Sequence, residues 1–164
     1  MIRKVSLEEF KKNIFLFPYL KKENKTTEQV NFALDEIEKQ NSIYKSEKKI
    51  FLKNEGYNFV HFLFCNEIQE NKDLRKNVEL ALRGINYDEF FITAFDDIVK
   101  QDKRVLMALA ERKDYRLRFC LSEEQKEDVE LLKEIISRYP SIFLGLSTKL
   151  KENKELKVIY EKNK

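Results

Sequence analysis

At 164 residues the chain is long enough for a single core, and with 42% hydrophobic residues it is too apolar for a disordered protein. The formal net charge is only +3, which argues against a domain that binds nucleic acid through its overall charge. Three glycines and two prolines are too few for a turn-rich all-β protein.

The N-terminus lacks the apolar core of a signal peptide, and no apolar run approaches the roughly 20 residues that span a bilayer. Cys65 and Cys120 each lie between apolar neighbours, so we expect two buried, reduced thiols rather than a disulfide. We therefore expect a cytoplasmic protein without a membrane partner. The excess of Lys over Arg and the frequent Asn indicate an AT-rich genome, bacterial or phage.

Capping boxes predict where the helices of the N-terminal part begin. Ser6 and Glu9 have capping-box spacing and lead into an apolar helix that ends near the first proline. Thr26 and Gln29 have the same spacing and lead into a second amphipathic helix, which we expect to end near Gln40.

Residues 50–64 leave two structures open. One is a β-hairpin with Gly56 in its turn, and the other is a helical hairpin in which Gly56 ends the first helix. Apolar runs this short do not separate the two by periodicity. We favour the β-hairpin, because strands are enriched in the aromatic residues that fill this segment.

From residue 66 onward, apolar positions at helical spacing predict short helices joined by turns of about two to five residues, so neighbouring helices should be antiparallel. We expect Gly84 to end the first of these helices, and Ser122 with Gln125 to form a third capping box. The predicted helices cover residues 73–83, 88–98, 102–110, 114–121, 122–136, 141–146 and 153–160.

A charged lead-in followed by Val or Leu recurs along residues 74–164. The first apolar residues are Val78, Val105, Val129 and Leu156, which lie 27, 24 and 27 residues apart. A period of this size is typical of stacked helical hairpins.

The fold class that follows is mainly α, an irregular αα-hairpin repeat array with a small β-hairpin near residues 50–64. We expect one domain over residues 1–164, with an N-terminal part (1–65) and helical-hairpin repeats (66–164). Arrays of this kind present a curved surface to another macromolecule.

The units Gln101–Leu109 and Glu152–Ile159 share one order, an acidic or Asn residue, Lys, a charged residue and then an apolar helix. Over about residues 50–160 this layout resembles the bacterial repeat family called domain of unknown function 4116. Gly84 and the aromatic pair that begins at Phe90 stand where that family has small residues. The family carries no established activity, so the resemblance implies an architecture and no chemistry.

No motif predicts catalysis or a bound metal. His61 is the only histidine, and although Cys65 follows four residues later, a zinc site needs three or four converging ligands. Carboxylate pairs such as Asp96 and Asp97 are frequent in so charged a chain, and we interpret them as solvated faces. Three glycines cannot form a standard phosphate-binding loop. We expect no enzymatic activity, no cofactor and no metal.

One local asymmetry stands out between Lys103 and Arg118. Arginine suits bidentate contacts to carboxylate or phosphate, and Arg112 and Arg116 are spaced one helical turn apart around Tyr115. The alternative interpretation is a solvated helix face whose charges pair with neighbouring Asp and Glu. The candidate partner-binding residues are Lys103, Arg104, Arg112, Lys113, Tyr115, Arg116 and Arg118.

The sequence thus predicts a non-enzymatic macromolecule-binding module with a protein partner. One specific form of this hypothesis is a small phage or mobile-element inhibitor of a host complex. The alternative is a nucleic-acid-binding helical repeat that uses the basic patch from Lys103 to Arg118 on phosphates.

Overall fold

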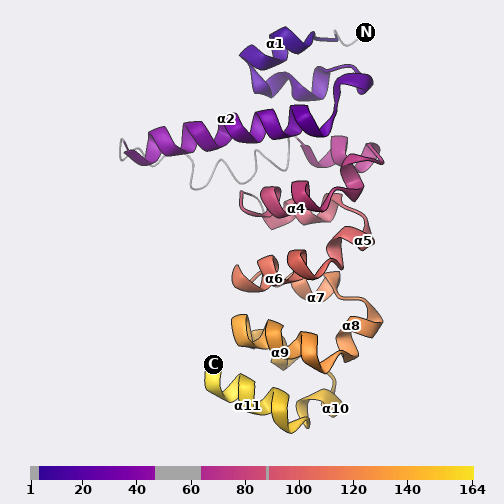
Figure 1. Ribbon diagram of the computed structural model, residues 1–164, viewed down its shortest axis with the longest axis vertical. Coiled ribbons are helices and arrows are strands. Elements are labelled where there is room, and N and C mark those ends of the chain that lie inside the picture. The colour runs from indigo at the N-terminus through magenta and orange to yellow at the C-terminus, as the bar shows by residue number, and fades with distance from the viewer. Residues whose placement is uncertain (1–3, 47–63, 88) are drawn as a thin grey trace. The chain divides into compact units, whose positions relative to one another are not determined.

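The computed structural model describes residues 4–46, 64–87 and 89–164 (Figure 1). Within these ranges the chain is mainly α-helical, as predicted, and its only β-type pairing is an isolated bridge between Val5 and Leu20. Residues 50–63 of the expected β-hairpin, and with them His61, lie outside the described residues. Phe64, the last residue of that segment, is described and is helical. The chain divides into two compact units, Met1–Asp96 and Asp97–Lys164. The single domain with parts 1–65 and 66–164 stays a prediction.

The first unit begins with a closed capping box. The hydroxyl of Ser6 accepts the backbone N–H of Glu9 at 3.2 Å, and the Glu9 carboxylate accepts the N–H of Ser6 at 2.8 Å. The box predicted at Thr26 is not closed, because Oε1 of Gln29 is buried and accepts no hydrogen bond. The unit contains α1 (Leu7–Lys12), η1 (Ile14–Tyr19), η2 (Lys22–Asn24), α2 (Thr27–Ser46), a helical segment over residues 64–70, η3 (Leu74–Lys76), α4 (Val78–Ile85) and η4 (Glu89–Ala94).

Aromatic rings join the N-terminal elements of this unit. Phe10 of α1 meets Phe17 of η1 edge to face at 5.8 Å and Phe32 of α2 at 5.6 Å between ring centroids. Phe17 in turn meets Phe64 of the helical segment at 4.9 Å. Each such pair contributes about 0.5–1.5 kcal/mol beyond its buried area, so the rings hold four separate segments around one core.

A charged cluster connects α2 to α4. Arg83 donates from Nη1 to the carbonyl and side-chain oxygens of Asn31 at 3.2 and 3.1 Å, and pairs with Asp35 and with Glu38 at 3.4 Å. The hydroxyl of Tyr87 donates to Glu38. Burial, together with the nearby Glu38 carboxylate, raises the pKa of Tyr87 to about 12. The Tyr87 hydroxyl therefore stays protonated, and able to donate to Glu38, across the physiological range.

Gly84 does not end its helix, contrary to the prediction. Helix α4 continues through Gly84 to Ile85, and the glycine is buried against η4. A Cβ atom at this position would overlap the ring of Phe91, which itself meets Phe95 edge to face at 5.3 Å. The missing side chain thus permits the close approach of η4 to α4.

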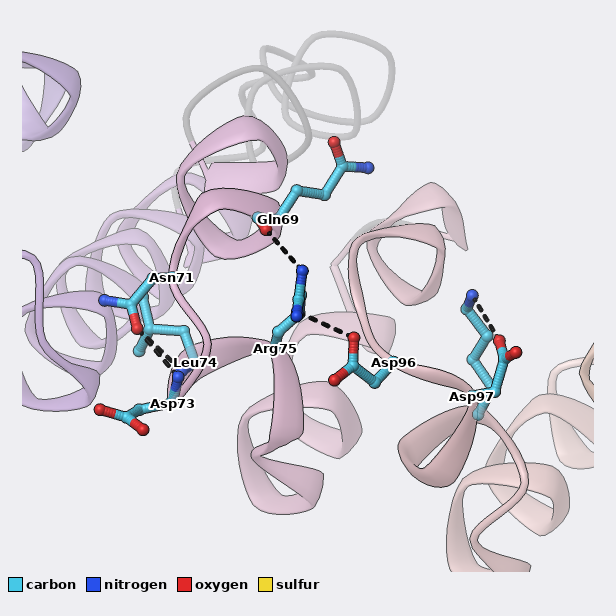
Figure 2. Close-up of polar contacts among 8 residues, drawn as sticks. Gln69, Asn71, Asp73, Leu74, Arg75, Asp96 and Asp97 are labelled. Atoms are coloured by element: carbon cyan, nitrogen blue, oxygen red, sulfur yellow. Dashed lines mark hydrogen bonds and ion pairs between the residues drawn. The ribbon is translucent and has the colours of Figure 1, made fainter.

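Near the end of the first unit, Arg75 contacts two other segments of that unit (Figure 2). Its Nε forms an ion pair with Asp96 at 2.8 Å, and its Nη1 donates to the carbonyl of Gln69 at 3.2 Å. Asp97, the next residue, pairs instead with Lys100 at 3.1 Å. The two neighbouring carboxylates are therefore each committed to a different cation.

In the second unit, α9 packs against both α6 and α11, and the three helices form successive layers (Figure 1). The core at the α9–α11 contact is made of Leu132, Ile136, Phe143, Leu150 and Leu156, and the ring of Phe143 stacks on Tyr160 at 4.5 Å. The unit contains α5 (Asp97–Lys100), α6 (Lys103–Glu111), α7 (Leu117–Cys120), α8 (Glu123–Glu127), α9 (Val129–Arg138), η5 (Pro140–Gly145), α10 (Thr148–Lys151) and α11 (Lys154–Asn163).

Asn or Asp caps four of the longer helices, and the caps are more evenly spaced than the first apolar residues. They are Asn77, Asp102, Asp128 and Asn153, and successive caps lie 25, 26 and 25 residues apart. A short helix precedes each cap, namely η3, α5, α8 and α10. Two predicted helices, 73–83 and 122–136, are therefore wrong as continuous elements, because Asn77 and Asp128 interrupt them. The predicted helix 88–98 is also wrong as one element, because η4 ends at Ala94 and α5 begins at Asp97. That successive capped units stack into one array stays a prediction.

Candidate binding surface

Residues 112–118 form the turn after α6 and the start of α7, and they carry a cluster of basic charge. They include four basic residues and one acidic residue, and their formal charge of +3 equals that of the entire chain. Helix α6 ends at Glu111 and α7 begins at Leu117, so Arg112 and Arg116 do not share a helix as the spacing predicted.

The turn is fixed by backbone geometry at the end of α6. Lys113 has a φ of 55°, in the left-handed region. The following N–H, that of Asp114, donates to the carbonyl of Leu109 at 2.9 Å. A left-handed residue followed by a bond back into the last helical turn is a common way to end a helix. It directs the chain away from α6 just before the remaining basic residues.

Arg116 is buried beneath the turn. Its side chain is 7% exposed and that of Asp114 is 2% exposed. The Asp114 carboxylate accepts Nε of Arg116 at 2.9 Å, Nη2 at 3.1 Å and the backbone N–H of Arg116 at 2.9 Å. Arg116 is therefore a structural residue of the turn, although the sequence placed it among the partner-binding candidates.

Arg118 lies between two exposed rings. Its Cζ is 4.6 Å from the centroid of the Phe119 ring and 5.9 Å from that of Tyr115. Phe119 is 68% exposed and Tyr115 is 48% exposed. The buried Arg116 contacts Tyr115 as well, with Cζ 5.0 Å from the ring centroid. An exposed cation and two exposed aromatic rings are thus held together on a rigid base.

The described arginines differ in whether a carboxylate neutralises them. Neither Arg112 nor Arg118 has a described carboxylate oxygen within 4.0 Å, and the same holds for Lys113. The other described arginines are paired, Arg75 with Asp96, Arg83 with Asp35 and Glu38, Arg104 with Asp102, Arg116 with Asp114, and Arg138 with Glu111.

The structure thus separates the predicted residues into three groups. Lys103 and Arg104 lie at the start of α6, where Glu134 and Asp102 pair with them. Arg116 is buried. Arg112, Lys113, Tyr115 and Arg118 are exposed on the turn and, together with Phe119, are called the basic–aromatic turn below.

Phe119 is the residue that the predicted set lacked. Its place in an apolar pattern indicated a core position, but α7 has only four residues and buries Leu117 and Cys120. Phe119 therefore points away from the core. Its position next to Arg118 and four residues after Tyr115 is the signal that identifies it.

The cysteines are buried and form no disulfide, as predicted. Burial raises the pKa of the Cys120 thiol to about 11, so this thiol is protonated at neutral pH and is a poor nucleophile.

Cys120 should make stability depend on pH in alkaline solution. Its pKa is about 11 in the folded chain against a reference value of 9.0, so folding favours the neutral thiol. That contribution is fully present below about pH 9 and is lost as the pH rises through about 11. In urea unfolding at several pH values, Cys120→Ala should lose less stability than the wild type over this range. An equal loss in both proteins would show that the thiol is not responsible.

Within the described ranges, no three His, Cys, Asp or Glu side chains are grouped so that they could hold a metal ion. No helix in the same ranges is both long and apolar enough to cross a membrane. The chain matches no protein family, no curated protein and no solved structure with which it was compared. The resemblance to domain of unknown function 4116 therefore stays an expectation from the sequence.

Proposed function

We propose that this chain is a non-enzymatic protein-binding module whose contact surface is the basic–aromatic turn and whose partner presents an acidic surface. The observation that supports it is that Arg112 and Arg118, alone among the described arginines, have no described carboxylate partner, and that Arg118 also contacts two exposed aromatic rings. Arg and Tyr are enriched at the energetic centres of protein interfaces. A guanidinium without a counter-ion inside the chain can take its counter-ion from a carboxylate of the partner.

The alternative is a nucleic-acid-binding helical repeat, which the exposed rings of Tyr115 and Phe119 favour because bases stack on such rings. However, the turn offers only the cations Arg112, Lys113 and Arg118 to phosphates. Lys103 and Arg104, which would lengthen the basic track, already pair with Glu134 and Asp102. Three neutralised phosphates give a salt slope of about −2 on a single strand and about −3 on duplex DNA, which is weak for a nucleic-acid-binding protein. A protein partner suits so short a surface better.

Charge reversal on the turn tests the proposal. Arg112→Glu with Arg118→Glu should abolish capture of the partner from a lysate of the native host, followed by mass spectrometry, while the far-UV circular dichroism stays unchanged. The matched control is Lys151→Glu with Lys157→Glu, which reverses two exposed charges of the same unit and should retain the partner. Capture by the turn variant equal to that of the control would place the contact surface elsewhere.

Fluorescence anisotropy with a single-stranded oligonucleotide separates the two functions. Absence of binding at about 20 mM salt, where screening is weak, would remove the nucleic-acid alternative. Binding with a salt slope of about −2, the value for three phosphates of a single strand, that the Arg112→Glu, Arg118→Glu variant abolishes would favour that alternative over a protein partner.

A further inference from the structure

Arg118 differs from Arg112 in the surroundings of its guanidinium. Its Cζ lies over the Phe119 ring, 4.6 Å from the centroid, and over the Tyr115 ring, 5.9 Å from the centroid. No described aromatic ring makes such a contact with Arg112. Rings that cover the face of a guanidinium leave its in-plane N–H donors available for hydrogen bonds.

The support beneath these rings is rigid. Tyr115 is held from below by the guanidinium of Arg116, whose Cζ is 5.0 Å from the ring centroid. Arg116 is itself locked by three hydrogen bonds to the buried carboxylate of Asp114. A side chain that is already held in place loses less conformational entropy when it binds, so more of the interaction appears as affinity.

Carboxylate suits this geometry better than nucleic-acid backbone. A carboxylate presents two oxygens to the planar fork of one guanidinium, and such bidentate pairs are among the strongest hydrogen-bonded contacts in proteins. Nucleic-acid backbone instead requires a succession of cations along the strand, and the basic–aromatic turn provides only Arg112 and Lys113 in addition to Arg118.

Resting on the proposed function, we propose that Arg118 is the anchor of the basic–aromatic turn and binds a side-chain carboxylate of an acidic peptide segment in bidentate fashion. Tyr115 and Phe119 hold the guanidinium and shield the ion pair from water. Arg112 and Lys113 contribute charge to the surface without a fixed geometry.

The test uses the full chain and a fluorescein-labelled decaglutamate peptide, measured by anisotropy at about 20 mM salt. Arg118→Lys keeps the charge but loses the fork and the stacking, so we expect its Kd to rise about tenfold. The matched variant Arg112→Lys should raise Kd by less than about twofold. Tyr115→Leu with Phe119→Leu leaves every charge in place and should raise Kd about as much as Arg118→Lys. All of these side chains are exposed, and far-UV circular dichroism checks that each variant is folded.

Each outcome decides between the inference and the proposed function. If Arg118→Lys and Arg112→Lys weaken binding equally, Arg118 is not an anchor, while an acidic partner for the turn still stands. If the wild type fails to bind decaglutamate, both the anchor and the acidic partner are wrong. If twelve-residue oligothymidylate binds more tightly than decaglutamate, the turn selects phosphate, and the carboxylate inference is overturned.

Discussion

Replacing Arg116 by alanine is expected to lower the free energy of unfolding by about 3–5 kcal/mol, because it leaves a buried carboxylate without its counter-ion. The side chain of Asp114 is 2% exposed and would be left with one backbone N–H as its remaining donor from residue 116. Urea unfolding followed by far-UV circular dichroism measures the loss. The effect is large because removing one partner from a buried pair exposes the full desolvation penalty of the other.

The chain provides a matched control for this experiment. Asp102 and Arg104 repeat the contact at the same sequence spacing, with the carboxylate accepting the Arg104 backbone N–H at 2.8 Å and Nε at 3.2 Å. The Arg104 hydrogen bond lowers the pKa of Asp102, but the Arg104 side chain is 57% exposed. Arg104→Ala should therefore cost less than about 1 kcal/mol.

A double variant shows whether the loss of stability comes from the unpaired charge of Asp114 or from the lost packing of the Arg116 side chain. Asp114→Asn with Arg116→Met removes both charges and keeps an acceptor for the backbone, so it should recover most of the stability that Arg116→Ala loses. If Arg116→Ala costs no more than Arg104→Ala, the pair is not buried in solution. Arg116 would then be a candidate partner-binding residue again, as the sequence predicted.

The contrast between these two Asp-x-Arg pairs shows where sequence reasoning about the surface stops. Both pairs have the same spacing and the same local hydrogen bonds, yet only the one on the α6–α7 turn is buried. Burial depends on how the chain leaves α6 after Lys113, whose left-handed backbone no pattern in the sequence predicts for a lysine.

Helix starts were predictable where they depend on a few adjacent residues. The boxes at Ser6 and Ser122 close as their spacing predicts, and Asp102 and Asn153 cap the helices that they were expected to open. Such caps are local, so the sequence carries their whole specification.

Breaks within apolar patterns were not predictable in the same way. Asp128 ends a run of polar residues that begins at Ser122, where an acidic residue is also acceptable on the solvent face of a continuing helix. In the structure its carboxylate accepts the N–H of Leu131 at 3.0 Å and begins a new helix. Asn77 does the same by accepting the N–H of Leu80 at 3.0 Å. Asp and Asn side chains compete with the helix for backbone N–H groups, and packing decides which wins.

Replacing Gly84 by alanine is the second substitution with a large expected effect, a loss of about 1–3 kcal/mol in the free energy of unfolding. Alanine is the better helix former by about 1 kcal/mol, so the overlap with Phe91 must outweigh that gain. Phe91 is fully buried, so a shift of its ring would disturb its packing, including the contact with Phe95. The control is Gly145→Ala, where a Cβ meets no atom within 4 Å and stability should change by less than about 0.5 kcal/mol.

A double-mutant cycle shows whether the contact between α4 and η4 causes the loss. Phe91→Leu alone should destabilise the chain, because it removes the edge-to-face contact with Phe95 and leaves space beside Gly84. That space can accept the alanine methyl group, so Gly84→Ala with Phe91→Leu should be more stable than the sum of the single changes by about 1 kcal/mol or more. If the two losses are additive, the alanine methyl group and the Phe91 ring do not compete for the same space. Gly84 would then matter for α4 itself and not for the packing of α4 against η4.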